Sequence, residues 1–178
     1  MTKAVDTTHL RVATADDAQM LAEFAARTFE ETFGPDNDPD DMRSYLATSF
    51  SEEKQRAEIQ DPDRVVWIAV ASSNQAIGYA IMRRGTRSNG ITGERPAEVQ
   101  RIYADRAWHG HGIGAALMAA CVEQARAWGC DELWLAVWER NPRAIAFYEK
   151  SGFRKVGRQT FMLGKDLQHD DVMALSIL

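Results

Sequence analysis

The chain has 178 residues, a length that suits one well-buried domain over residues 1–178 and is short for two. Hydrophobic residues make up 45% and charged residues 26%, and the net charge is −5, which fits a soluble globular protein without the basic face that nucleic-acid binding requires. No apolar run is long enough to span a membrane, and residues 1–10 do not resemble a signal peptide. Cys121 and Cys130 lack the spacing of a zinc site and are expected to be reduced thiols, so we expect a cytoplasmic protein.

The first half of the chain predicts strands at both ends and helices between them. Oxygen-bearing side chains over residues 14–17 indicate a helix start, and apolar residues at helical spacing follow. The Gly- and Asp-rich segment 34–41 predicts a loop. In chain order, the expected elements are a strand at 10–13, a helix that includes 20–29, short helices at 40–49 and 52–60, and hairpin strands at 64–71 and 76–84.

The second half predicts alternating strands and helices after a polar, glycine-rich loop at residues 85–96. The expected elements are a strand at 97–104, a helix at 112–128, a strand at 131–138, a helix at 141–150, and antiparallel strands at 153–163 and 172–178. This order of elements indicates an α/β protein with a mixed sheet and helices on both faces.

The most informative segment is a glycine-rich loop at residues 109–115, between a predicted strand and a predicted helix. Glycine lets a ligand approach the backbone, and a helix N-terminus offers free N–H groups and the positive end of its dipole. This combination favours a site for a diphosphate. A tight turn that only packs closely is the alternative interpretation.

Two other phosphate-binding motifs are considered for the same loop. Gly110, Gly112 and Ala115 formally fit a dinucleotide-binding fingerprint, but that motif normally opens its domain, and here about a hundred residues precede it. A P-loop is excluded because no Gly-Lys-[Ser/Thr] sequence occurs in the loop.

Residues 141–153 read NPRAIAFYEKSGF and closely resemble the N-x-x-A-x-x-F-Y-x-K-x-G-F pattern of the GNAT superfamily of acyltransferases. The glycine-rich loop resembles the superfamily's [Arg/Gln]-x-x-Gly-x-[Gly/Ala] loop, with His109 in the first position as a departure. A histidine there can still donate to phosphate, although its charge depends on pH. Shorter segments at 28–33, 101–103, 137–139 and 161–164 resemble the PaiA-type polyamine N-acetyltransferases.

The resemblance implies a mostly antiparallel, twisted sheet of about seven strands, splayed between the fourth and fifth strands. It further implies that the pantetheine arm of acetyl-CoA enters this gap and that the pyrophosphate rests on the glycine loop. The implied acetyl-CoA-binding residues are Ile102, Tyr103, Ala104, His109, Gly110, His111, Gly112, Ile113, Gly114, Ala115, Asn141 and Lys150.

Acetyl transfer to an alkyl amine first requires deprotonation, because the amine has a pKa near ~10.4. Glu98 is the candidate base, and a solvated glutamate without a catalytic role is the alternative. Strand alternation predicts that Glu98 shares a face with Gln100 and Ile102. The opposite face is then predicted to carry Val99, Arg101 and Tyr103. Tyr148 matches the family position of the acid that protonates the leaving thiolate, and packing is its alternative role. The amide of Ala104 is the expected donor to the oxyanion.

The acceptor is expected to be a small amine, with a polyamine such as spermidine or spermine favoured chiefly by the resemblance. Four aspartates in residues 36–41 would attract a cation, or they are simply turn and cap residues. Trp134 and Trp138 are predicted to pack in the hydrophobic core rather than to form an aromatic cage for a cation. The histidines are not expected to bind metal. Alternatives are an acyl-CoA-binding regulator with little catalysis, or acetylation of amino-acid or protein amines; a homodimer is expected by analogy.

Overall fold

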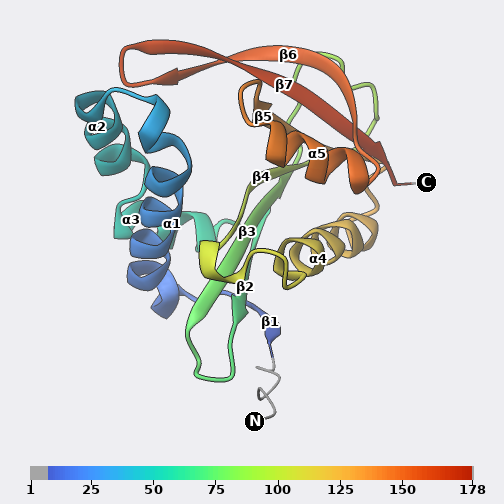
Figure 1. Cartoon of the computed structure of the whole chain (residues 1–178). Coiled ribbons are helices and arrows are strands. Elements are labelled where there is room, and N and C mark those ends of the chain that lie inside the picture. The colour runs from blue at the N-terminus through green and yellow to red at the C-terminus, as the bar shows by residue number, and fades with distance from the viewer. Residues whose placement is uncertain (1–7, 178) are drawn as a thin grey trace.

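Seven strands form one sheet in the order β1-β2-β3-β4-β5-β7-β6 in the computed structural model, which describes residues 8–177 (Figure 1). Neighbouring strands are antiparallel, except for the parallel pair β4 and β5. The strands are β1 His9–Val12, β2 Arg64–Val70, β3 Ala76–Arg84, β4 Pro96–Ala104, β5 Glu132–Trp138, β6 Arg154–Leu163 and β7 Asp166–Ser176. The helices are α1 Ala18–Phe33, α2 Pro39–Ser49, α3 Glu52–Gln60, α4 Ile113–Ala127 and α5 Pro142–Lys150, with 3₁₀ turns at Ala15–Asp17, Gly34–Asp36 and Arg106–Trp108.

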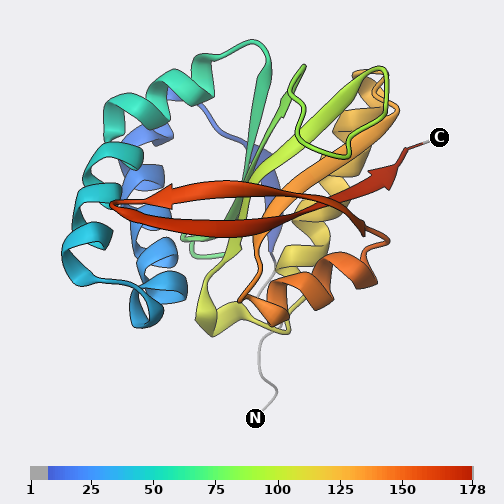
Figure 2. The same cartoon turned by 90° about the horizontal axis from the view of Figure 1, so that it is seen from above.

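Helices cover both faces of the sheet, as Figure 2 shows from above: α1, α2 and α3 on one face, and α4 and α5 on the other. Leu117 and Cys121 of α4 pack with Val99 on their side, whereas Phe24 of α1 packs with Tyr79 on the opposite side. The predicted α/β sheet with helices on both faces is therefore confirmed. Among the helices of residues 8–177, none is long and apolar enough to cross a bilayer.

The sheet is split between β4 and β5. These strands pair only where Pro96–Glu98 meets Glu132–Trp134, although β4 stays paired with β3 as far as Ala104 and β5 with β7 along its whole length. Beyond Glu98 the two strands therefore diverge, which confirms the predicted splay. At this split, β4 and β5 no longer form a continuous sheet between the α1 face and the α4 face.

A β-bulge in β4 changes which side chains face each layer. Ile81 pairs with Arg101 and Met82 pairs with Val99, so Gln100 is an extra residue without a partner in the ladder. Glu98 and Gln100 consequently share the α1 face with Arg101 and Tyr103, whereas Ile102 packs on the α4 face. The predicted alternation holds for Glu98, Val99 and Gln100 and is wrong from Arg101 onward, because simple period-2 counting does not include the bulge.

Two element boundaries also differ from the prediction. Helix α2 begins at Pro39, inside the expected loop, because the Asp38 side chain caps its first turn by accepting from the amides of Asp40 and Asp41. Strand β7 begins at Asp166, six residues earlier than expected, and its polar first half pairs with β6 across a tight turn. The expectation about residues 1–10 falls largely on residues 1–7, outside the described part, as does Leu178 of the last predicted strand.

Candidate active site

The glycine loop lies at the N-terminus of α4. Gly110 and Gly112 have φ angles of +83° and +80°, a left-handed conformation that favours glycine. A Cβ atom added at either glycine would meet no other atom within 4 Å, so the space above the loop backbone is open. No side chain caps the helix, whose N-cap residue is Gly112. Free backbone amides and an open approach are the features that fit a diphosphate.

The two histidines of the loop point their ring nitrogens at backbone carbonyls. His109 Nε2 donates to the carbonyl of Ala104 at 3.1 Å, which ties the loop to the end of β4. His111 Nδ1 lies 3.2 Å from the carbonyl of His109, and its ring contacts Trp108 edge-on. The remaining ring nitrogen of each histidine can donate to a phosphate only when the imidazole carries a second proton, and the phosphate-binding role of both side chains stays a prediction.

Helix α5 carries the remaining residues named by the resemblance. Asn141 caps this helix by accepting from the amide of Ala144 at 3.2 Å. Tyr148 is buried on the α4 side, in edge contact with Phe147 and Phe153. Burial raises the pKa of the Tyr148 hydroxyl above its ordinary value, so this group keeps its proton at neutral pH. Lys150 is exposed at the last turn of the helix.

A cavity of about 240 Å³ lies on the opposite side of the split, among α1, α2, β4, β5, β6 and β7. Its aromatic lining consists of Phe29, Phe33, Tyr45, Tyr103, Trp138 and Phe161. Its polar lining consists of Glu98, Gln100, Arg101, Gln159, Gln168 and Asp170. Tyr103 directly precedes Ala104, to which the glycine loop is bonded, so the cavity and the loop meet at the open end of β4.

The polar groups that β4 contributes to this cavity are already paired. Glu98 Oε2 accepts from Arg83 Nε at 2.7 Å and from Thr86 Oγ1 at 3.0 Å. Gln100 Oε1 accepts from the Arg64 guanidinium at 2.6 Å. The predicted base Glu98 therefore lies in the cavity, but within an ion pair.

The third polar group of β4 in this lining, Arg101, forms a buried ion pair. The Arg101 guanidinium donates to both carboxylate oxygens of Glu58, the shorter contact being 2.8 Å. Both side chains are almost fully buried. A buried pair of this kind fixes the Arg101 side chain in the cavity lining, and the Glu58 carboxylate balances the charge of that guanidinium.

Sequence reasoning missed Asp170 as a site residue, because β7 was expected to begin after it. In the structure Asp170 lines the cavity and is only 8% exposed. Burial, together with the nearby charge of Asp171, raises the pKa of Asp170 to about 6 despite a hydrogen bond from Gln159. Residues 166–171 read DLQHDD and show no apolar alternation, so the sequence carried no signal for this part of the strand.

The two tryptophans of β5 have different environments. Trp134 is buried in the core and donates from Nε1 to the carbonyl of Thr86 at 3.0 Å. Trp138 lines the cavity and contacts Phe33 edge-on, with ring centroids 5.8 Å apart. The core interpretation therefore holds for Trp134, whereas Trp138 belongs to the cavity wall.

The aspartates of residues 36–41 mostly serve local structure. Besides the cap formed by Asp38, Asp40 pairs with Arg43 at 2.8 Å, and Asp41 accepts from the amide of Lys165 at 3.1 Å. The last contact fastens α2 to the β6–β7 turn, which Figure 1 shows reaching across to α2. These bonds support the interpretation as turn and cap residues.

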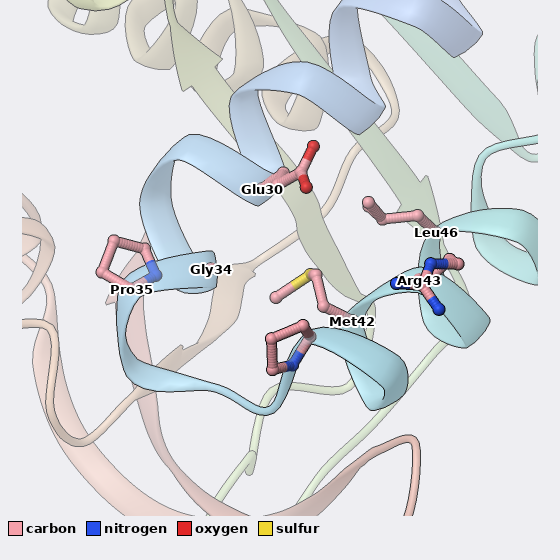
Figure 3. Close-up of a pocket in the computed structure, with 7 residues that line it drawn as sticks. Glu30, Gly34, Pro35, Met42, Arg43 and Leu46 are labelled. Carbon is pink, nitrogen blue, oxygen red and sulfur yellow. The ribbon is translucent and has the colours of Figure 1, made fainter.

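A second hollow, of about 570 Å³, lies between the end of α1 and the start of α2 (Figure 3). Glu30, Met42, Arg43 and Leu46 contribute to its lining. It shares no residue with the lining of the cavity at the split and does not include the glycine loop. We therefore place the chemistry at the split.

Comparison with known proteins decides the family. The profile of the Acetyltransferase (GNAT) family matches residues 20–153. The chain belongs to the GNAT acetyltransferase family. A protein of Mycobacterium tuberculosis described as an uncharacterized N-acetyltransferase is 33% identical over 162 residues, covering 91% of this chain and 99% of that one. A protein of Lactobacillus delbrueckii, likewise described as an uncharacterized N-acetyltransferase, is 32% identical over 161 residues, covering 89% of this chain and 92% of that one.

Among solved structures, the PaiA N-acetyltransferase of Thermoplasma acidophilum in complex with coenzyme A has the same fold. Its TM-score is 0.76 at 21% identity, with 96% of this chain and 99% of that chain covered. This GNAT protein is accordingly an N-acetyltransferase, as the motif at residues 141–153 indicated. The split sheet and the glycine loop are the parts of the GNAT fold that its sequence motifs encode.

Proposed function

We propose that this GNAT enzyme transfers the acetyl group of acetyl-CoA to a small alkyl amine, and that the amine is a polyamine such as spermidine or spermine. The observation that carries the proposal is the position of the aromatic, acid-containing cavity at the same split in the sheet that the glycine loop flanks. One substrate then approaches from each face, and transfer is direct within a ternary complex.

The glycine loop supports acetyl-CoA as the donor. Its amides at the start of α4 suit a pyrophosphate, and the open space over Gly110 and Gly112 leaves room for it. The edge of β4 at residues 102–104 faces the split without a β5 partner, so the backbone groups there that point away from β3 remain available to an extended pantetheine arm, apart from the Ala104 carbonyl that accepts from His109. Acetyl-CoA supplies the activated acetyl thioester.

Tyr148 is proposed as the proton donor on the α4 side of the split. Its raised pKa keeps the hydroxyl protonated, so the group can donate one proton to a departing thiolate. The Ala104 amide remains the proposed donor to the carbonyl oxygen. A base role for Glu98 remains a prediction, which the ion pair with Arg83 makes less favourable.

The cavity supports a small amine as the acceptor. A volume of about 240 Å³ suits a short alkyl chain, and aromatic walls accommodate both methylene groups and a cation. The carboxylate of Asp170 and the net charge of −5 favour a cationic molecule. A polyamine combines an alkyl chain with ammonium groups, which suits aromatic walls and a carboxylate without an ion-pair partner among the described residues.

Release of the CoA thiol with acetyl-CoA and a panel of amines tests the proposal. Spermidine, spermine and putrescine are compared with free amino acids and a lysine peptide. We expect saturable thiol release with spermidine or spermine. Release only with the peptide or the amino acids would move the acceptor to those classes. CoA binding without release for any amine would favour the regulatory alternative.

A further inference from the structure

Asp170 is a carboxylate of the acceptor cavity that forms no ion pair among residues 8–177. The other carboxylate in the lining, Glu98, is bound to Arg83 at 2.7 Å. A buried carboxylate without a cation is costly unless it takes up a proton or a positively charged ligand. The cavity therefore contains one acidic group whose charge the protein leaves unbalanced.

Asp170 belongs to a row of three cavity residues on neighbouring strands. In the ladders of the sheet it pairs with Trp138 of β5 on one side and with Gln159 of β6 on the other. Directly paired residues point to the same face, and all three line the cavity. Gln159 bonds to Asp170, and its Oε1 accepts from Ser88 Oγ at 2.6 Å, so the amide is held with its NH₂ group toward the carboxylate. The row is thus positioned before any substrate arrives.

The charged groups around this row are engaged elsewhere. Arg158 pairs with Glu139 and Asp171, and Lys155 pairs with Asp171 at 2.6 Å. The titratable and charged groups that face Asp170 are His169 and Asp171 of β7, Glu139 after β5, Arg158 of β6, Tyr45 of α2, and Glu98 and Arg101 across the cavity. Because both arginines in this set have carboxylate partners, an incoming ammonium is the missing partner of Asp170.

We propose that Asp170 binds the ammonium group of the acceptor and then accepts its proton, acting as the general base of acetyl transfer. This inference rests on the proposed function, because it requires an amine acceptor in the cavity. Trp138 presents its ring beside the carboxylate, so the ammonium meets one acidic and one aromatic partner.

The transfer step balances with the groups present. One ammonium proton moves to a carboxylate oxygen of Asp170, and the freed nitrogen lone pair forms a C–N bond with the acetyl carbonyl carbon of the thioester. The C–S bond breaks, its electron pair leaves on sulfur, and the sulfur takes the proton of the Tyr148 hydroxyl. The nitrogen then carries one proton more than an amide and releases it to solvent, and proton exchange with solvent restores the Asp170 carboxylate and the Tyr148 hydroxyl.

The raised pKa of Asp170 supports this role. At about 6, the carboxyl is ionised at neutral pH and is still a stronger base than an ordinary aspartate. The folded-state pKa lies above the unfolded value, so ionisation of Asp170 lowers folding stability as pH rises toward neutrality. Removal of the charge should therefore stabilise the fold at neutral pH, which checks that the carboxylate is buried and unbalanced, whereas the kinetic pH profile tests its role as a base.

The test compares Asp170→Asn with the wild type by amine-dependent kinetics between about pH 5 and pH 9, by CoA binding and by thermal unfolding. We expect kcat/KM for spermidine to fall by about 100-fold or more at neutral pH. The wild-type inflection near pH 6 should disappear, since it reports the ionisation of Asp170. CoA affinity should be unchanged, and Tm at neutral pH should rise while the gain shrinks toward pH 5.

Two further variants serve as comparisons. Glu123→Gln removes an exposed carboxylate of α4 that is absent from the cavity lining, and it should keep activity within about threefold. Glu98→Gln should keep the inflection near pH 6. An Asp170→Asn enzyme with wild-type kcat/KM, or with the inflection intact, would overturn the assignment and leave the proposed function standing. A wild-type protein that binds CoA and acetylates no amine would overturn both.

Discussion

The Nε atom of Arg83 lies 2.7 Å from Oε2 of Glu98, at the last position where β4 and β5 still pair. Thr86 donates to the same oxygen at 3.0 Å, so the carboxylate joins β4 to β3 and to the loop that follows it. Two donors on one oxygen hold Glu98 at the closed end of the split. This arrangement suits a structural role for Glu98 better than proton transfer.

Glu98→Gln should accordingly affect stability and activity only moderately. The neutral amide keeps a hydrogen-bond acceptor for Arg83 but loses the ionic contribution, so we expect a loss of about 1 kcal/mol in the free energy of unfolding. We expect kcat/KM for the amine to fall by less than about tenfold. Urea unfolding and initial rates measure the two effects. A loss of activity above about 100-fold with an intact fold would restore Glu98 as the base.

Gly112→Ala should weaken CoA binding at the glycine loop. The substitution places a Cβ in the open space above the backbone and strains a residue with φ near +80°. We expect the Kd for CoA to rise by about tenfold or more, with an unfolding penalty of about 1 kcal/mol. Gly85→Ala is the matched control, because Gly85 has φ near +79° and equally open surroundings. Equal Kd values for the two variants would argue against phosphate binding at this loop.

Tyr148→Phe should separate catalysis from cofactor binding. Loss of the hydroxyl removes the proposed donor to the thiolate, whereas the ring keeps its contacts with Phe147 and Phe153. We expect kcat to fall by about 100-fold with CoA affinity nearly unchanged. Stopped turnover with normal CoA calorimetry would support the enzyme role. Unchanged turnover would assign Tyr148 to packing alone.

Glu58→Ala should destabilise the protein where Arg101 lines the acceptor cavity. The variant leaves Arg101 buried without its partner, and breaking such a pair typically costs about 3 kcal/mol or more. Glu52→Ala serves as the control on the same helix, since Glu52 pairs with Arg56 at an exposed site worth less than about 1 kcal/mol. Denaturant unfolding of both variants measures the difference. Similar losses for the two would show that the Arg101 charge is solvated.

The sequence predicted those parts of the enzyme that are encoded by local patterns. Segment 141–153 and the glycine loop are contiguous motifs, and the split between β4 and β5 followed from the resemblance that these motifs carry. Helix and strand order followed from hydrophobic periodicity, which is also a local signal. The element order and the α4 side of the site were therefore available without coordinates.

The acceptor side of the site depends on contacts between distant segments. The bulge at Gln100 moves the later β4 residues to the opposite faces of the sheet. A glycine within a strand often indicates a bulge, but β4 contains none. Asp170 lines the cavity because β7 pairs it with Trp138 of β5. The residues around Asp170 are mostly polar, so the sequence did not indicate a strand there. The ion pair of Glu98 likewise depends on Arg83 from the neighbouring strand. Such pairings require the tertiary structure.

The most direct test of the central claim, that a small alkyl amine is acetylated in this cavity, uses a variant that fills it. Ala136 lines the cavity from β5, and Ala136→Leu adds bulk there without touching the glycine loop. Initial rates at saturating acetyl-CoA against spermidine concentration should show saturable acetylation by the wild type and a KM raised by about tenfold in the variant, with equal CoA affinity. Identical spermidine kinetics for the two proteins, or no acetylation by the wild type, would contradict the account.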